Sequence, residues 1–106
     1  MSNIVRKGDF LVFENIEGDV TEFFVSKGSF DLDRCRTGGF GRKYVPNCFG
    51  FKIVSSISHD GHYYKGGSEY WITRKATLEE RDKFLRWMKE KGHKFNQNTL
   101  ELTLNR

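Results

Sequence analysis

The residues best suited to chemistry lie in one short stretch, residues 34–44, which we call the basic loop. It combines arginine and lysine with glycines and aromatic rings, and it contains no acidic residue. Glycines let backbone amides approach an anion, arginine binds a phosphate bidentately, and an aromatic ring can stack on a base. We therefore expect a phosphate-rich ligand, either nucleic acid or a nucleotide. The residues expected to bind it are Arg34, Arg36, Phe40, Arg42, Lys43 and Tyr44.

The same stretch has a simpler interpretation. It matches neither a P-loop nor a dinucleotide-binding fingerprint. A glycine-rich connector between two strands would show the same composition, with its basic side chains solvated. Both interpretations stay open at this point.

A second group of aromatic residues, Tyr63, Tyr64 and Trp71, predicts a different partner. Exposed tyrosine and tryptophan are typical of protein-binding surfaces. Our second hypothesis is therefore a protein–protein interaction module, an accessory or inhibitor of a host complex. The competing interpretation is that these rings lie partly in the core and partly on an ordinary surface.

Catalytic and metal-binding chemistry has little support in the residue types. Of the candidate ligands only His59 and His62 lie close in sequence, whereas Cys35 and Cys48 are well separated. A zinc site usually draws its ligands in closely spaced pairs. No nucleophile signature accompanies the histidines and Asp60. We expect a protein that is not an enzyme and that uses no cofactor or metal.

The totals predict one small domain, residues 1–106, with a core of its own. Ten phenylalanines and an aromatic content of 15% can fill such a core without the help of disulfide bonds or metal ions. The net charge of +4 favours a polyanionic partner. No apolar run could span a bilayer, and no signal peptide is recognisable, so we expect a cytoplasmic protein without membrane contact. Two thiols in such a chain are most simply reduced; a disulfide that closes the glycine-rich segment is the alternative.

A helix expected at residues 77–91 organises the chain. Thr77 and Glu80 have the spacing of a capping box, and Gly92 suits the left-handed stop after a helix. Helical spacing places an apolar stripe on one face, formed by Leu78, Phe84, Leu85 and Met88. A strand over residues 100–104 follows a short turn.

Strands are expected upstream of this helix, at residues 10–13, 20–27, 49–57, 62–65 and 69–73. Residues 27–47 between them contain several glycines and the only proline, so we expect an irregular segment. In the strand at 49–57 the aromatic residues alternate, which places Phe49, Phe51 and Ile53 on one side.

The predicted fold class is α+β. We expect a curved, mostly antiparallel sheet or a small open barrel of five to six strands, with one C-terminal helix packed on it. The apolar face of the helix, through Phe84, Leu85 or Met88, should contact the phenylalanine-lined face of the strand at 49–57.

Residues 47–54 resemble the octamer of the RNA-recognition motif, in which two aromatic residues around a glycine stack on bases. The resemblance would give that role to Phe49 and Phe51. Alternating aromatics on a strand more commonly line the core, and we favour that interpretation for both residues.

The C-terminal third of the chain resembles a module found in small uncharacterised proteins of phages and bacterial mobile elements. The similar residues are Ala-Thr-Leu-Glu-Glu at 76–80, Phe84, and the segments 92–96 and 99–102. This resemblance implies no activity. It implies a setting, that of a short accessory protein in a bacterial cell or its virus.

Overall fold

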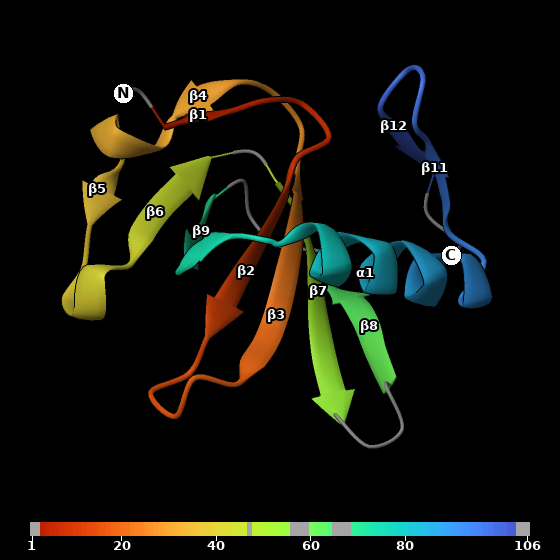
Figure 1. Ribbon diagram of the computed structural model, residues 1–106, viewed down its shortest axis with the longest axis horizontal. Helices are drawn as coiled ribbons and strands as arrows, with labels where there is room; N and C mark the ends of the chain where they lie inside the picture. Colours follow the sequence, from red (N-terminus) through yellow and green to blue (C-terminus); the bar gives the residue numbers. More distant parts are fainter. Residues whose placement is uncertain (1–2, 47, 56–59, 65–68, 104–106) are drawn as a thin grey trace. The chain divides into compact units, whose positions relative to one another are not determined.

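The computed structural model describes the backbone of residues 3–46, 48–55, 60–64 and 69–103, and the side chains of residues 3–45, 48–51 and 71–103. Internal contacts divide the chain into two compact units, Met1–Lys75 and Ala76–Arg106. We call them the sheet unit and the helix unit and describe each by itself (Figure 1). That the chain forms a single domain stays a prediction.

The main sheet of the sheet unit has five strands in the order β10-β2-β3-β7-β8, and every pairing is antiparallel. Its strands are β2 (Phe10–Glu14), β3 (Val20–Ser26), β7 (Cys48–Ser55), β8 (Asp60–Tyr64) and β10 (Arg74–Lys75). The β2–β3 hairpin turns where the sequence predicts it. The Asn15 side chain accepts hydrogen bonds from the amides of Glu17 and Asp19, both at 2.9 Å, and Gly18 supplies a positive φ of 88°.

Two smaller sheets complete this unit. Strand β1 (Ile4–Val5) pairs with β4 (Phe30–Asp31). The other sheet has the order β5-β6-β9, built from β5 (Arg36–Thr37), β6 (Lys43–Pro46) and β9 (Glu69–Ile72). Two short 3-10 turns, η1 (Leu32–Arg34) and η2 (Gly39–Gly41), lie between the short strands.

The segment at residues 27–47, expected to be irregular, contains short strands and 3-10 turns among its described residues. Strands β4 and β5 are two residues long each, and β6 is four residues long. Such short strands carry too few residues to show an alternating pattern. Strand β4 pairs with β1 and β6 pairs with β9, both distant in the sequence, and β5 pairs with the nearby β6.

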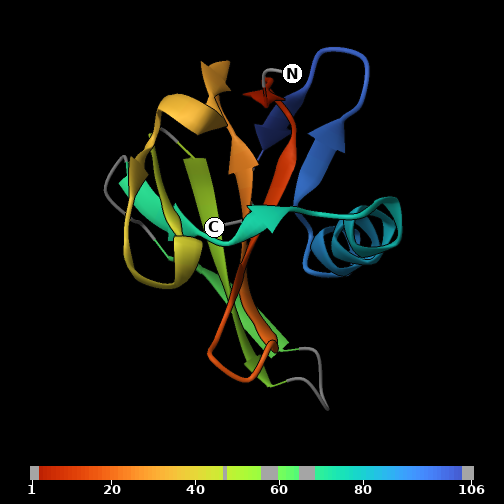
Figure 2. The same cartoon turned by 60° about the vertical axis from the view of Figure 1, so that its left-hand side comes forward.

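Both faces of the central part of the main sheet are buried. On one face Phe23 stacks against Phe10 and Phe51, at ring-centroid distances of 6.3 and 4.7 Å. On the other face a cluster of buried side chains joins the main sheet to the smaller sheets. Its members are Val5, Leu11, Phe24, Leu32, Val45, Cys48 and Ile72. This cluster holds the three-stranded sheet against the main sheet. The two sheets lie side by side in both ribbon views (Figures 1 and 2).

The aromatic residues of β7 take the places that their alternation predicts. Phe51 is completely buried, so the interpretation of a core residue is confirmed and base stacking is excluded for it. Phe49 is half-buried beneath the Lys27 ammonium group, which lies 4.6 Å from the ring centroid. The side chain of Ile53 lies outside the described residues.

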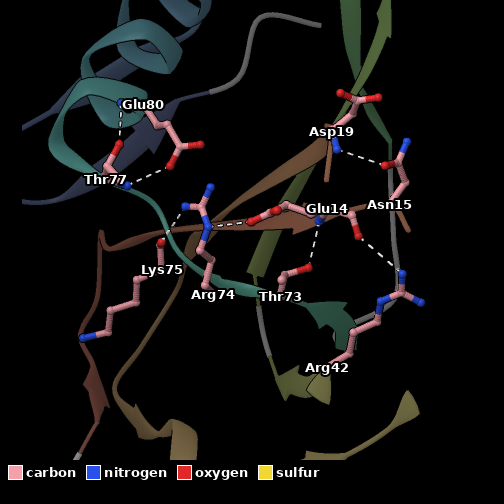
Figure 3. Close-up of polar contacts among 9 residues, drawn as sticks. All are labelled: Glu14, Asn15, Asp19, Arg42, Thr73, Arg74, Lys75, Thr77 and Glu80. Atoms are coloured by element: carbon pink, nitrogen blue, oxygen red, sulfur yellow. Dashed lines mark hydrogen bonds and ion pairs between the residues drawn. The ribbon is translucent and has the colours of Figure 1, made fainter. Parts of the chain in front are cut away.

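In the helix unit, α1 (Leu78–Glu90) begins and ends as predicted. The Thr77 hydroxyl accepts from the Glu80 amide at 3.1 Å, and the Glu80 carboxylate accepts from the Thr77 amide at 2.9 Å (Figure 3). Gly92 follows with a φ of 86°. Phe84 and Met88 are buried. Leu78, expected on the same face, is instead 79% exposed, because it is the first residue of the helix and lies at the end of the apolar stripe.

A two-stranded hairpin follows the helix, formed by β11 (Lys94–Asn96) and β12 (Glu101–Thr103). The Asn96 side chain accepts hydrogen bonds from the amides of Asn98 and Thr99, at 2.9 and 3.1 Å, which closes the turn. The strand predicted at 100–104 is present from Glu101, since Leu100 has a φ of 60° and still belongs to the turn.

The predicted α+β class, with a mostly antiparallel arrangement of strands and one C-terminal helix, is confirmed. The described strands form several separate sheets and close no barrel. The predicted contact of Phe84, Leu85 or Met88 with the phenylalanines of β7 joins the two units and stays a prediction. None of the helices among the described residues is both long and apolar enough to cross a bilayer.

Candidate functional site

The basic loop is a hairpin at the edge of the three-stranded sheet. Arg36 on β5 lies opposite Tyr44 on β6, and Tyr44 lies opposite Trp71 on β9. Directly opposed residues of antiparallel strands project from the same face. Arg36, Tyr44 and Trp71 therefore form one row across the sheet, which we call the outer row.

The outer row faces away from the core. Ile72, the neighbour of Trp71 on the same strand, is completely buried. Successive residues of a strand point to opposite faces, so the outer row lies on the face opposite to the buried Ile72. The rings of Tyr44 and Trp71 lie 4.8 Å apart between centroids, tilted by 48°. Trp71 is 36% exposed, and Arg36 is exposed. The structure thus brings Trp71, predicted to bind protein, beside two residues predicted to bind a phosphate-rich ligand.

Gly38 explains why this hairpin fits against the indole. A Cβ atom at this position would lie 2.4 Å from Cζ3 of Trp71, which is closer than real contacts allow. The glycine backbone therefore lies directly on the ring. Its amide donates to the Arg42 carbonyl at 2.7 Å, so this amide is used to close the hairpin and not to approach an anion.

Arg42 is held inside the sheet unit. Its Nη2 donates to the Glu14 carbonyl at 3.3 Å, and its guanidinium carbon lies 4.5 Å from the centroid of the Phe13 ring. The same carbon lies 5.4 Å from the centroid of Phe40. These contacts make Arg42 a residue that positions the basic loop; that it also binds the ligand stays a prediction.

Glu14, whose carbonyl accepts the hydrogen bond from Arg42, also contacts two other residues (Figure 3). It lies at a shift in the β2–β3 register, which frees its backbone and side chain for other partners. Its amide donates to the Thr73 hydroxyl at 2.8 Å, and its carboxylate accepts from the Arg74 guanidinium at 2.5 Å. One residue therefore joins β2 both to the basic loop and to the link between β9 and β10.

The remaining predicted residues differ in how accessible they are. The Arg34 side chain is 88% exposed, and the Asp31 carboxylate lies 3.7 Å away; an exposed pair at this distance contributes little and leaves the guanidinium available. Phe40 is 80% exposed. The Lys43 ammonium donates to the Thr37 hydroxyl at 2.8 Å, on the face opposite to the outer row.

The side chains of several other residues singled out in the sequence lie outside the part of the chain that the structure describes. The side chains of Tyr63, Tyr64 and His62 lie outside the described residues, as does the whole of His59. Within the part of the chain that the structure describes, no group of three histidine, cysteine or acidic residues is arranged to hold a metal.

The two cysteines are thiols that form no disulfide. Burial raises the pKa of Cys48 to about 12, with a smaller opposing effect from Lys27. Burial likewise raises the pKa of Cys35, which is less enclosed. Neither thiol has the lowered pKa that an attacking nucleophile needs.

Sequence reasoning missed the pairing of Gly38 with Trp71 and the internal role of Arg42. Both depend on residues far apart in the chain, and no local pattern indicates them. A comparison with known protein families, curated proteins and solved structures finds no match. The resemblance to phage and mobile-element proteins therefore stays a prediction.

Proposed function

We propose that this protein is a small non-catalytic binding protein that takes a phosphate-rich ligand, nucleic acid or a nucleotide, at the basic loop and the outer row. The arrangement of Arg36 beside Tyr44 and Trp71 is the observation that carries this proposal. It combines a guanidinium for a phosphate with two aromatic rings for a base.

The charges around the outer row support the same ligand. Arg34 is largely exposed at the start of the basic loop, and residues 34–44 contain no carboxylate that would repel a phosphate. The whole chain carries a net charge of +4, which favours the approach of a polyanion. Bound phosphates would release counterions, so affinity should depend on salt.

The test compares a double variant, Arg34→Ala with Arg36→Ala, with the unchanged protein. Fluorescence anisotropy would follow the binding of labelled single-stranded and duplex oligonucleotides, with ATP as a competitor. The unchanged protein should bind a nucleic acid less tightly as salt rises from about 50 to about 200 mM. The double variant should bind more weakly and lose part of that salt dependence, because two phosphate contacts are removed.

The matched control is the double variant Lys83→Ala with Lys89→Ala. Both lysines are exposed on α1, so this control removes the same charge from the chain without touching the basic loop. It should bind like the unchanged protein. Equal losses in the two double variants would show an effect of net charge alone and would refute a site at the basic loop. Absence of binding to every probe at low salt would also overturn the proposal.

The protein-binding alternative keeps Tyr63, Tyr64 and Trp71; of these, Trp71 is the residue whose side chain the structure describes, and it is 36% exposed. It remains a hypothesis, as do the cytoplasmic location and the bacterial or viral setting.

A further inference from the structure

Packing within the described part of the sheet unit does not explain why position 40 carries a phenylalanine. Its side chain is 80% exposed, so the ring gains little from burial. Its backbone has φ 60° and ψ 28°, a left-handed conformation that is unfavourable for any residue with a Cβ atom. Glycine on either side, at positions 39 and 41, lets the chain make this turn. A third glycine would suit this backbone better, so neither burial nor backbone geometry accounts for a phenylalanine here.

The Phe40 ring is held in place from within the protein. The Arg42 guanidinium carbon lies 5.4 Å from its centroid, and that guanidinium is itself fixed by the Glu14 carbonyl and the Phe13 ring. An aromatic ring supported in this way loses little freedom when a ligand stacks on it. The contact between the guanidinium and the ring thus fixes the orientation of the exposed Phe40 ring before a ligand binds.

The supported ring lies close to the outer row. Gly38 lies directly on the indole of Trp71, and Phe40 is only two residues further along the chain. The Cα atoms of positions 38 and 40 can be at most about 7 Å apart. One short ligand can therefore meet both aromatic surfaces together with Arg34 and Arg36 at the start of the loop.

We propose that the ligand is single-stranded nucleic acid, with one base stacked on Phe40 and its phosphates near Arg34 and Arg36. This inference rests on the proposed function and names its ligand class. In a duplex the faces of the bases are covered by their neighbours, so only an unstacked base can lie on an exposed ring. The absence of any acidic residue in the basic loop favours a polyanion over a protein segment as the partner of this ring.

The test uses three variants of the full chain, Phe40→Gly, Phe40→Trp and Ile16→Ala. Glycine removes the ring and suits the left-handed backbone, so the variant should keep its fold. Tryptophan keeps a stacking surface. Ile16 is a matched control, because it is 79% exposed in the β2–β3 turn of the same unit and should have no part in binding.

The probe is a fluorescein-labelled single strand of about 12 nucleotides, within the range of known single-strand sites, compared with a duplex of the same sequence. The unchanged protein should bind the single strand at least about tenfold more tightly than the duplex. Loss of one stacked base should weaken single-strand binding by about fivefold or more in Phe40→Gly. Phe40→Trp and Ile16→Ala should bind normally, and the salt dependence of Phe40→Gly should not change, since no charge is lost.

The outcomes separate this inference from the proposed function. Equal affinity for duplex and single strand, or normal binding by Phe40→Gly, would refute the single-strand inference. If the double arginine variant still lost affinity in that case, the proposed function would stand without it. If no nucleic acid bound at low salt, this inference would fail, and if ATP did not bind either, the proposed function would fail with it.

Discussion

At the scale of single residues, the contact of Gly38 with Trp71 gives the most specific prediction. In Gly38→Ala the new Cβ would lie 2.4 Å from the indole, so the ring or the hairpin must move. We expect a loss of about 1–3 kcal/mol in the free energy of unfolding, as for other overpacked sites. Urea unfolding followed by circular dichroism would measure it, and tryptophan emission should change in the native state.

The neighbouring glycine provides the control for this substitution. A Cβ at Gly39 would meet no atom within 4 Å, so Gly39→Ala should change the free energy of unfolding by less than about 0.5 kcal/mol. The prediction is wrong if the two alanine variants are equally stable.

Residue chemistry alone could not separate the four basic residues of the loop. Arg34, Arg36 and Arg42 carry the same group within one short stretch, yet only Arg42 contacts Glu14 and Phe13. Its partners lie almost thirty positions earlier in the chain. The sequence therefore identified the stretch that carries the charge but not the division between an arginine that fixes the loop and those that stay exposed.

At the scale of elements, the start of α1 depends on two reciprocal hydrogen bonds. Thr77→Ala removes the hydroxyl that accepts from the Glu80 amide, so an amide of the first turn loses its partner. We expect a loss of about 0.5–2 kcal/mol in the free energy of unfolding. Urea denaturation would measure the change, with Thr77→Ser as the variant that keeps the hydroxyl.

The serine variant should regain most of the lost stability, because serine caps a helix as well as threonine does. If alanine and serine at position 77 gave the same midpoint, the capping box would contribute nothing measurable to α1.

The elements that the sequence predicted well are those whose signals are local. The two residues of the capping box, Thr77 and Glu80, lie three positions apart at the start of α1, and the Asn15 side chain accepts a hydrogen bond within the β2–β3 turn. Strands β5 and β6 carry no such signal, because β5 has two residues and β6 exists through its pairing with β9. The outer row could not be predicted for the same reason, since its register brings together positions 36, 44 and 71.

At the scale of the whole molecule, the pattern of expected strands and one helix predicted the class of the fold correctly and did not indicate the division into two units. The phenylalanines fill a sheet that is buried on both faces, which an aromatic content of 15% permits. Basic and aromatic residues of the loop lie at one edge of that sheet unit. Charge totals could not indicate this, because a total carries no position.

The buried thiol of Cys48 gives a prediction about the sheet unit as a whole. Its side chain is 2% exposed, and burial raises its pKa to about 12. In Cys35→Ser, Ellman's reagent at neutral pH should react with Cys48 far more slowly in the native state than in urea. Reaction at the same rate in both states would contradict the burial of this residue.

The raised pKa also sets a limit on alkaline stability. The fold favours the protonated thiol, so its contribution is complete below the ordinary pKa of 9.0 and is lost as pH rises toward about 12. The free energy of unfolding should therefore decrease over that interval. Cys48→Ala should remove this part of the decrease.

The Cys48 sulfur lies in the buried cluster with Leu11, Phe24 and Ile72, so a reagent reaches it only when that cluster opens. The time course of its modification in the folded protein would then count spontaneous openings of the barrier around it. The modification rate of this one sulfur atom would thus report how often the folded protein opens locally, with no dye or label attached beforehand.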